Sequence, residues 1–267
     1  HRHHDHHRLS DVLADHDLVQ SPGRRGIAMG TLDDEVRDLA TVVDAAGLQR
    51  FALFGRSQGS AISIRYAALN PDRVSHLILA GGFARGWMKR GERPPDAQQA
   101  RAYWQLIEHG WAQNNAAFHQ LLTSEMFPGA SADQRQAFMT MQRMACTPQD
   151  AVRLARMMAQ YDASDDLVRV RCPTLVLHSP DDVCVPFEQG RLIALARRRS
   201  DTAVELVRQE LSETEQATFL QRMADQLRQL HEQIAAGHFQ IRGQVSESAV
   251  VIDRVRAWLA ETPLPPN

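Results

Sequence analysis

The feature that most constrains the fold of this chain is the alternation of short, continuously apolar runs with helical segments. Phe51-Ala-Leu-Phe54 and Ser75-His-Leu-Ile-Leu-Ala80 are too short for helices and do not alternate polar with apolar residues. A helical pattern from Thr31 to the stop at Gly47 precedes the first run, and another from Gly59 to Leu69 separates the two. Strands covered on both faces read as continuous apolar runs. We therefore predict an α/β protein with a mostly parallel sheet and helices on both faces.

The same pattern returns only after a long interval. Pro173-Thr-Leu-Val-Leu-His178 reads as a strand, followed by a helix over residues 187–199 and another strand near residues 203–207. Between Gly86 and Arg171 only helical stretches occur, near residues 98–109, 115–122, 132–144 and 148–160. We therefore expect a His-rich segment at 1–16, an α/β core at 17–86 and 172–262, and a helical cap at 87–171.

Aromatic and methionine residues recur in the expected cap, and two interpretations stay open. They include Trp87, Trp104, Trp111, Phe118 and Met139. Such residues form either the core of the inserted helices or a lid that lines an apolar substrate pocket.

Length, charge and cysteine content exclude several classes of protein. The 267 residues fit one large domain or one domain with an insertion, and the formal charge of -2 gives no cationic field for nucleic acid. Cys146, Cys172 and Cys184 are odd in number and form no CxxC pair, so we expect neither disulfides nor a cysteine zinc site. No apolar run of about 18 residues occurs. We expect a cytoplasmic protein that does not bind membranes.

The first seven residues contain five histidines, among them His1 and His7. Converging imidazoles could bind a transition metal, but a solvated terminal segment does not fix its ligands. We therefore predict no metal site.

The pentapeptide Gly55-Arg56-Ser57-Gln58-Gly59 stands between a predicted strand and a predicted helix. A strand that turns at once into a helix brings backbone segments close together, which favours glycine at Gly55 and Gly59. The turn holds the Ser57 hydroxyl clear of the sheet, above a helix N-terminus that favours negative charge. Ser57 is therefore the candidate nucleophile.

Serine at its ordinary pKa needs a general base and an acid that orients the base. Asp181 and Asp182 follow the strand at 173–178, at the sheet edge where open α/β sheets bind ligands. We favour Asp182 over Asp181, and a solvated Asp pair that caps the next helix is the alternative. His238 follows both in the chain and is the candidate base. We interpret His231 as a helix-surface residue and His178 as a sheet-edge residue.

Several stretches between Thr31 and Arg199 resemble the α/β-hydrolase domains that accompany bacterial LuxR-type regulators. They are Val42-Val-Asp-Ala-Ala-Gly-Leu48, Phe51-Ala-Leu-Phe-Gly-Arg-Ser-Gln-Gly59, Pro71-Asp-Arg-Val-Ser-His-Leu-Ile-Leu79, Gly110-Trp-Ala-Gln-Asn-Asn115 and Val185-Pro-Phe-Glu-Gln-Gly-Arg191. The resemblance implies Ser57 as nucleophile, Asp182 as acid, a helical cap and no cofactor.

Two departures from that family bear on activity. No strands with a His-Gly loop precede Asp17, so the oxyanion hole is left with the N–H of Gln58, and losing one donor typically costs 10²–10³ in rate. The helix predicted between Ser212 and Ala236 also separates Asp182 from His238.

We expect a serine hydrolase that acts on an ester or a similar small acyl compound without a cofactor. The alternative is a catalytically impaired ligand-binding or regulatory domain from a hydrolase-regulator fusion. The apolar stripe of the helix at 213–236 covers either its own sheet or a second subunit, so a homodimer through this helix is possible.

Overall fold

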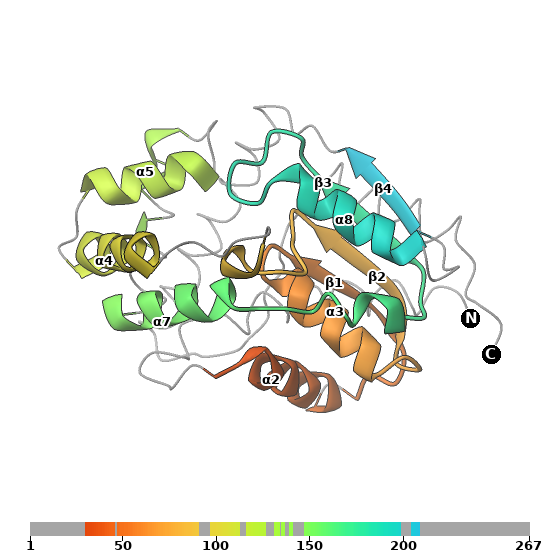
Figure 1. The fold of residues 1–267 in the computed structure, drawn as a ribbon. Helices are drawn as coiled ribbons and strands as arrows, with labels where there is room; N and C mark the ends of the chain where they lie inside the picture. Colours follow the sequence, from red (N-terminus) through yellow and green to blue (C-terminus); the bar gives the residue numbers. More distant parts are fainter. Residues whose placement is uncertain are drawn as a thin grey trace.

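A parallel sheet, with four strands among the described residues, forms the centre of the protein, shown as a computed structural model in Figure 1. The structure describes residues 30–45, 47–90, 97–112, 116–126, 131–133, 135–136, 139–140, 147–198 and 204–208. The strands are β1 (Phe51–Arg56), β2 (Val74–Ala80), β3 (Thr174–His178) and β4 (Val204–Arg208), in the order β1-β2-β3-β4. The predicted α/β architecture with a parallel sheet is confirmed.

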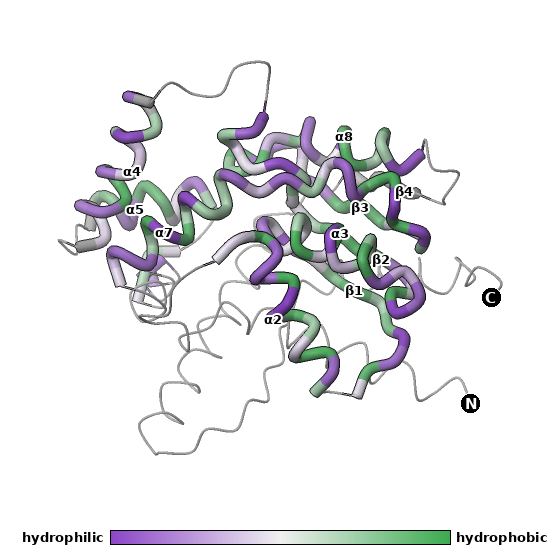
Figure 2. The backbone as a smooth tube through the Cα atoms, turned by 60° about the horizontal axis from the view of Figure 1, so that its bottom comes forward, coloured by the Kyte–Doolittle hydropathy of each residue, from purple (hydrophilic) through white to green (hydrophobic). Residues whose placement is uncertain are grey.

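Strands β1, β2 and β3 are largely apolar and largely buried because the core surrounds them. Leu53 of β1, Leu77 of β2 and Leu175 of β3 are fully buried, and all five residues of β3 are buried. The hydropathy colouring of Figure 2 shows β1 and β2 as largely hydrophobic. Each large side chain buried in this way contributes roughly 1.5–3 kcal/mol.

Three helices accompany the strands: α2 (Leu32–Ala45), α3 (Gly59–Leu69) and α8 (Phe187–Arg198). Helix α3 contacts β1 and β2, α8 contacts β3 and β4, and α2 packs on α3. The predicted stop of α2 is confirmed, since Gly47 has a φ of 67° and Leu48 donates its N–H to the carbonyl of Val43 at 3.2 Å.

The chain between β2 and β3 forms a separate group of helices, α4 (Ala97–Ala112), α5 (Ala116–Met126) and α7 (Pro148–Ala159). They lie together to one side of the sheet in Figure 1. A small core joins α4 to α7 through Ala100, Trp104, Val152 and Ala159. Trp104 of α4 therefore belongs to a core between the inserted helices.

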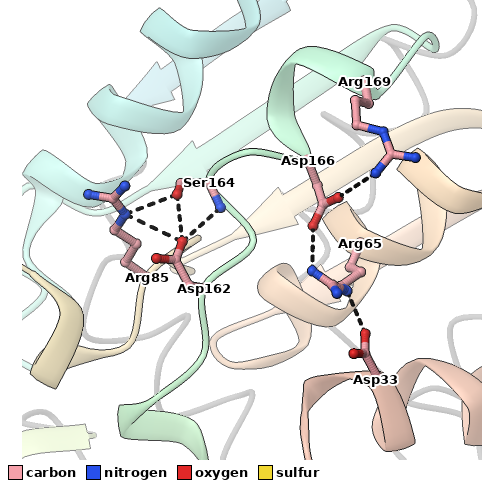
Figure 3. Close-up of polar contacts among 7 residues, drawn as sticks. All are labelled: Asp33, Arg65, Arg85, Asp162, Ser164, Asp166 and Arg169. Atoms are coloured by element: carbon pink, nitrogen blue, oxygen red, sulfur yellow. Dashed lines mark hydrogen bonds and ion pairs between the residues drawn. The ribbon is translucent and has the colours of Figure 1, made fainter.

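The chain leaves and re-enters the core at one place, where Arg85 and Asp162 form an isolated antiparallel bridge. Ala163 donates its N–H to the carbonyl of Ala84 at 2.9 Å, and Arg85 Nε donates to Ser164 Oγ at 3.0 Å. Figure 3 draws the contacts of the Arg85 side chain with Asp162 and Ser164. Together these contacts fix the departing and the returning chain against each other.

A second group of charges in Figure 3 holds the returning chain against the helices. Arg65 on α3 bonds Asp33 at the start of α2 at 2.6 Å and Asp166 at 3.1 Å. Asp166 precedes the short helix η3 (Leu167–Arg169) and also pairs with Arg169 at 3.4 Å. The approach to β3 is thus tied to α2 and α3.

Other predictions fall outside the described residues, namely the His-rich segment at 1–16, the helix at 213–236 and the C-terminal helix at 247–260. The predicted helix at 132–144 is described at six positions, all of them helical. Among the described helices, none combines the length and the apolar character needed to cross a bilayer.

Candidate active site

Ser57 occupies a strained turn between β1 and α3. Its φ is 50°, and it is the one non-glycine residue with a positive φ in the described part of the chain. Its N–H donates to the carbonyl of Ala80 at 3.0 Å, which continues the β1–β2 ladder up to the turn. Ser57 is exposed while Gln58, Gly59 and Ser60 after it are buried. The turn therefore presents the Ser57 side chain at the surface above a buried helix start.

Gln58 holds the position directly before α3. Its backbone is already helical, with φ of -58° and ψ of -29°, and α3 begins at Gly59. The first N–H groups of a helix lack intrahelical acceptors and carry partial positive charge. The N–H of Gln58 is therefore available to an oxygen that develops negative charge beside Ser57.

Two glycines follow β2 and lie between Ser57 and the loop that joins β3 to α8. We call this loop, which carries Asp181 and Asp182, the acid loop. Gly81 has a φ of 52°, and a Cβ there would lie 3.3 Å from Asp182 Oδ2. A Cβ at Gly82 would lie 2.9 Å from the carbonyl oxygen of Ser57 and would overlap the Ser60 hydroxyl. Only glycine lets the backbone after β2 come this close to Ser57 and to Asp182. Gly81 and Gly82 therefore bring the carboxyl ends of β1 and β3 together. Sequence reasoning missed these residues, although a Gly-Gly pair directly after a buried strand is a usable signal.

The structure distinguishes Asp182 from Asp181. Asp181 is exposed, whereas Oδ1 of the half-buried Asp182 accepts N–H bonds from Cys184 at 3.0 Å and Val185 at 2.8 Å. These bonds stay within the loop and do not cap α8, which begins at Phe187. Asp182 Oδ2 points toward Gly81, on the side of the loop that faces β2.

The interpretation of His178 as a sheet-edge residue is wrong. β4 pairs beyond β3, with His178 opposite Arg208, so His178 ends an interior strand and is buried. Its Nε2 lies 2.8 Å from the carbonyl oxygen of Val185 and 3.7 Å from Asp182 Oδ2. The sequence did not reveal that the strand at 203–207 would pair on this side.

One charged side chain from the segment after β2 interacts with the acid loop. The guanidinium of Arg90 lies 4.8 Å over the ring of Phe83, and its Nε donates to the carbonyl of Arg85 at 2.8 Å. Burial lowers the pKa of Arg90, and the charge of Asp182 opposes that change. The positive charge of Arg90 and the negative charge of Asp182 therefore attract each other.

Electrostatic interactions link the acid loop to α4 and α5. Burial, Glu125 and Cys184 together raise the pKa of Tyr103 on α4. Burial first, then the charges of Asp182 and Glu125, raise the pKa of Cys184 to about 11. Side chains of both cap helices therefore stand close to the loop that carries Asp182.

His238 lies outside the described residues, so the structure gives Ser57 and Asp182 but not the predicted base. Within the described part, no three His, Cys, Asp or Glu side chains are grouped as metal ligands would be.

Comparison with known proteins assigns the family. Residues 19–210 match the family described as serine aminopeptidase, S33, a span that includes Ser57 and Asp182 but not His238. The chain belongs to this family. It is a hydrolase of the α/β-hydrolase superfamily.

Relatives and solved structures agree with that assignment. The proteins from Caulobacter sp. strain K31 and Azorhizobium caulinodans, which carry the name carbamate hydrolase RutD as an unproven assignment, are 25% and 27% identical. Their alignments cover 70% and 68% of this chain and 68% and 67% of the relatives.

Among solved structures, an esterase from Exiguobacterium antarcticum has a TM-score of 0.56 at 21% identity, over 76% of this chain and 74% of the esterase. A bromoperoxidase from Bacillus anthracis has a TM-score of 0.54 at 22% identity, over 75% and 80%. These likenesses confirm the α/β-hydrolase fold.

Proposed function

We propose that this protein is a serine hydrolase that cleaves an ester or a similar small acyl compound through Ser57, His238 and Asp182. The observation that carries the proposal is the positive φ of Ser57 at an exposed turn between a buried strand and a helix start. A strained backbone of this kind costs of order 1–3 kcal/mol and persists where the surrounding structure enforces it, often at active sites.

The proposed reaction has two steps. Ser57 Oγ attacks the carbonyl carbon while His238 takes its proton, and the Gln58 N–H stabilises the oxyanion. The intermediate collapses, and His238 returns the proton to the departing alcohol or amine. Water then attacks the acyl-Ser57 ester by the same route, releasing the acid and restoring the Ser57 hydroxyl. The name of the RutD relatives adds carbamates to the acyl compounds that deserve testing.

Asp182 is the proposed acid because of how its two oxygens are used. Two backbone N–H groups bind Oδ1, while Oδ2 faces the β2 end next to Ser57. A carboxylate fixed in this way can accept a hydrogen bond from an imidazole and hold it in the required tautomer. Asp181 is exposed, and its backbone N–H donates to Ser179 Oγ at 3.3 Å. This bond does not fix the Asp181 carboxylate.

A fluorophosphonate probe tests the nucleophile. We expect the wild-type protein to be labelled at Ser57 and the label to disappear in Ser57→Ala. Ser63→Ala is the matched control, because Ser63 is buried on α3, the helix that follows Ser57, and its hydroxyl has no hydrogen-bond partner among the described residues. Its labelling and stability should equal those of the wild type.

Hydrolysis of short-chain p-nitrophenyl esters tests the other two residues. His238→Ala and Asp182→Asn should each lower kcat by at least about 10²-fold, because the triad acts as a unit. Asp181→Asn should leave the rate within a factor of about two. A folded wild-type protein that resists the probe would contradict the proposal and favour the ligand-binding alternative.

A further inference from the structure

His178 and the loop after it form a closed network of contacts around Asp182. The imidazole ends β3, and its side chain is fully buried. His178 Nε2 and the carbonyl oxygen of Val185 are 2.8 Å apart, and because a carbonyl only accepts, Nε2 carries the proton and donates. The bond joins the first and last residues of the turn that carries Asp182.

Val185 is held from both sides. Its N–H donates to Asp182 Oδ1 at 2.8 Å, while its carbonyl accepts from His178. The Asp182 carboxylate therefore depends on His178 through one intervening residue. Nε2 also lies 3.7 Å from Asp182 Oδ2, the oxygen that the proposed base would use.

The imidazole is itself fixed from the opposite side. The ring of Phe187 meets it edge-on with 5.8 Å between ring centroids. A Cβ on Gly190 of α8 would lie 2.7 Å from His178 Nδ1 and 3.0 Å from both His178 Cβ and Cγ. Glycine at 190 therefore lets α8 support the ring in the orientation that points Nε2 at Val185.

We infer that His178 is a positioning residue for Asp182: it fixes the acid loop so that Asp182 Oδ2 stays directed at the catalytic base. The inference rests on the proposed role of Asp182. His178 does not contact substrate in this role and acts only through the loop. Since a displacement of about 1 Å can cost 10²-fold in rate, loosening this loop should impair turnover.

The test compares His178→Leu with His178→Gln in the full chain. Leucine removes the donor, whereas the glutamine Nε2 reaches about as far as the imidazole Nε2 and can still donate to Val185. On p-nitrophenyl acetate we expect kcat to fall about 10- to 100-fold in His178→Leu with KM little changed. His178→Gln should stay within about threefold of the wild type.

The pH profile separates positioning from a general loss of structure. A carboxylate beside the base stabilises its imidazolium and raises its pKa, so a misplaced Asp182 shifts the acidic limb of kcat/KM to lower pH. Arg90 also acts on Asp182 but is unchanged in every variant. We expect the limb to shift in His178→Leu and not in His178→Gln.

Two further variants make the comparison sharp. Gly190→Ala removes no polar group but places a Cβ against the imidazole, so it should reproduce the kinetic defect and the limb shift of His178→Leu. Thr174→Val is the matched control: Thr174 is buried on the same strand and bonds Cys172 and Arg197, away from the loop. It should lower stability without moving the limb.

Amide hydrogen exchange gives a readout that needs no turnover. The N–H groups of Cys184 and Val185 bond Asp182, and their exchange should be at least about tenfold faster in His178→Leu than in the wild type or His178→Gln. Unchanged exchange and an unmoved limb in folded His178→Leu would overturn the inference. If the proposed function fails instead, the wild type itself resists the fluorophosphonate probe, and exchange still decides whether His178 holds the loop.

Discussion

At the scale of single residues, backbone strain is concentrated at the proposed nucleophile. Two hydrogen bonds hold Ser57 at a φ of 50°. The Ser57 N–H donates to the carbonyl of Ala80, and the Ser57 carbonyl accepts the N–H of Ser60 at 3.1 Å. A left-handed conformation costs an L residue roughly 1–2 kcal/mol that glycine does not incur. Stability and activity therefore make opposite demands at position 57.

Replacing Ser57 measures this strain. We expect Ser57→Gly to be more stable than Ser57→Ala by about 1 kcal/mol, because only glycine adopts the turn without a Cβ penalty. Both variants should resist the fluorophosphonate probe. Urea denaturation of the two proteins gives the difference, and equal midpoints would show that the turn is not strained.

Gly55 tests the close contact within the same turn. A Cβ at Gly55 would lie 2.5 Å from Ser63 Oγ and 2.6 Å from the carbonyl oxygen of Gly59. The second contact is with backbone, so Gly55→Ala should lower the free energy of unfolding by about 2 kcal/mol or more and reduce probe labelling.

Gly47→Ala serves as the comparison for Gly55→Ala. Gly47 has a positive φ but nothing within 4 Å of a built Cβ, so its substitution should cost only about 1 kcal/mol from the backbone alone. Ser63→Ala added to Gly55→Ala should restore little, since the clash with Gly59 remains. Full rescue by that double variant would contradict the backbone explanation.

At the scale of secondary-structure elements, one buried arginine joins α8 to the chain that enters β3. Arg197 is fully buried and donates to four acceptors: Leu167 O and Val170 O at 2.6 Å, Cys172 O at 3.1 Å and Thr174 Oγ1 at 3.2 Å. All four are neutral, so hydrogen bonds rather than an ion pair compensate the buried charge. Burial lowers its pKa. The path of the chain into the start of β3 depends on this side chain.

Arg197→Leu should lower the free energy of unfolding by about 3 kcal/mol, because it leaves buried carbonyl groups without donors. Arg197→Lys should recover only part of this loss, since one ammonium cannot reach four acceptors spread over residues 167–174. Arg198→Leu, on the neighbouring position, should change stability by less than about 0.5 kcal/mol. Denaturant titrations of the three variants decide, and a stable Arg197→Leu protein would contradict this account.

At the scale of the whole molecule, a charge on the inserted helices acts on the acid loop. Asp182 comes from the loop after β3 and Glu125 from the end of α5, and both charges act on Cys184. The raised pKa of this thiol therefore reports whether α5 stands over the loop. The sequence places these residues about 60 positions apart and gives no sign of their proximity.

Alkylation of Cys184 measures that arrangement. With a pKa of about 11 in place of 9.0, its thiolate fraction at pH 8 is about 100-fold lower, and alkylation by iodoacetamide should slow accordingly. The rate should rise about tenfold per pH unit up to pH 11. Glu125→Gln and Asp182→Asn should each increase it at pH 8, because removing a negative charge lowers the thiol pKa.

Glu108→Gln on α4 is the control, since Glu108 is not among the groups that act on Cys184. Site-resolved mass spectrometry gives the rate at each cysteine. If Cys184 reacts as fast as an ordinary thiol and ignores Glu125→Gln, then α5 does not cover the loop in solution.

Much of the fold could be predicted from local patterns. The apolar runs, the stop at Gly47 and the glycines around Ser57 each depend on residues close together in the chain, so their signals survive in the sequence. The choice of Asp182 over Asp181 stays a prediction. What supports it is the pair of N–H groups, of Cys184 and Val185, that bind Asp182 Oδ1, and not a place at the loop's tip. His238 stays a prediction.

The sequence by itself determined the strands, the helices and the turn that carries Ser57, because short-range sterics and the period of apolar residues decide these. Only the tertiary structure decided which of these elements would meet. The pairing of β4 beside β3 buries His178, the Gly81-Gly82 pair brings two strand ends within contact distance, and α5 brings Glu125 to Cys184. Such contacts arise from packing between segments far apart in the chain. A local pattern such as the Gly81-Gly82 pair can indicate a close approach, but it does not identify the segment that approaches.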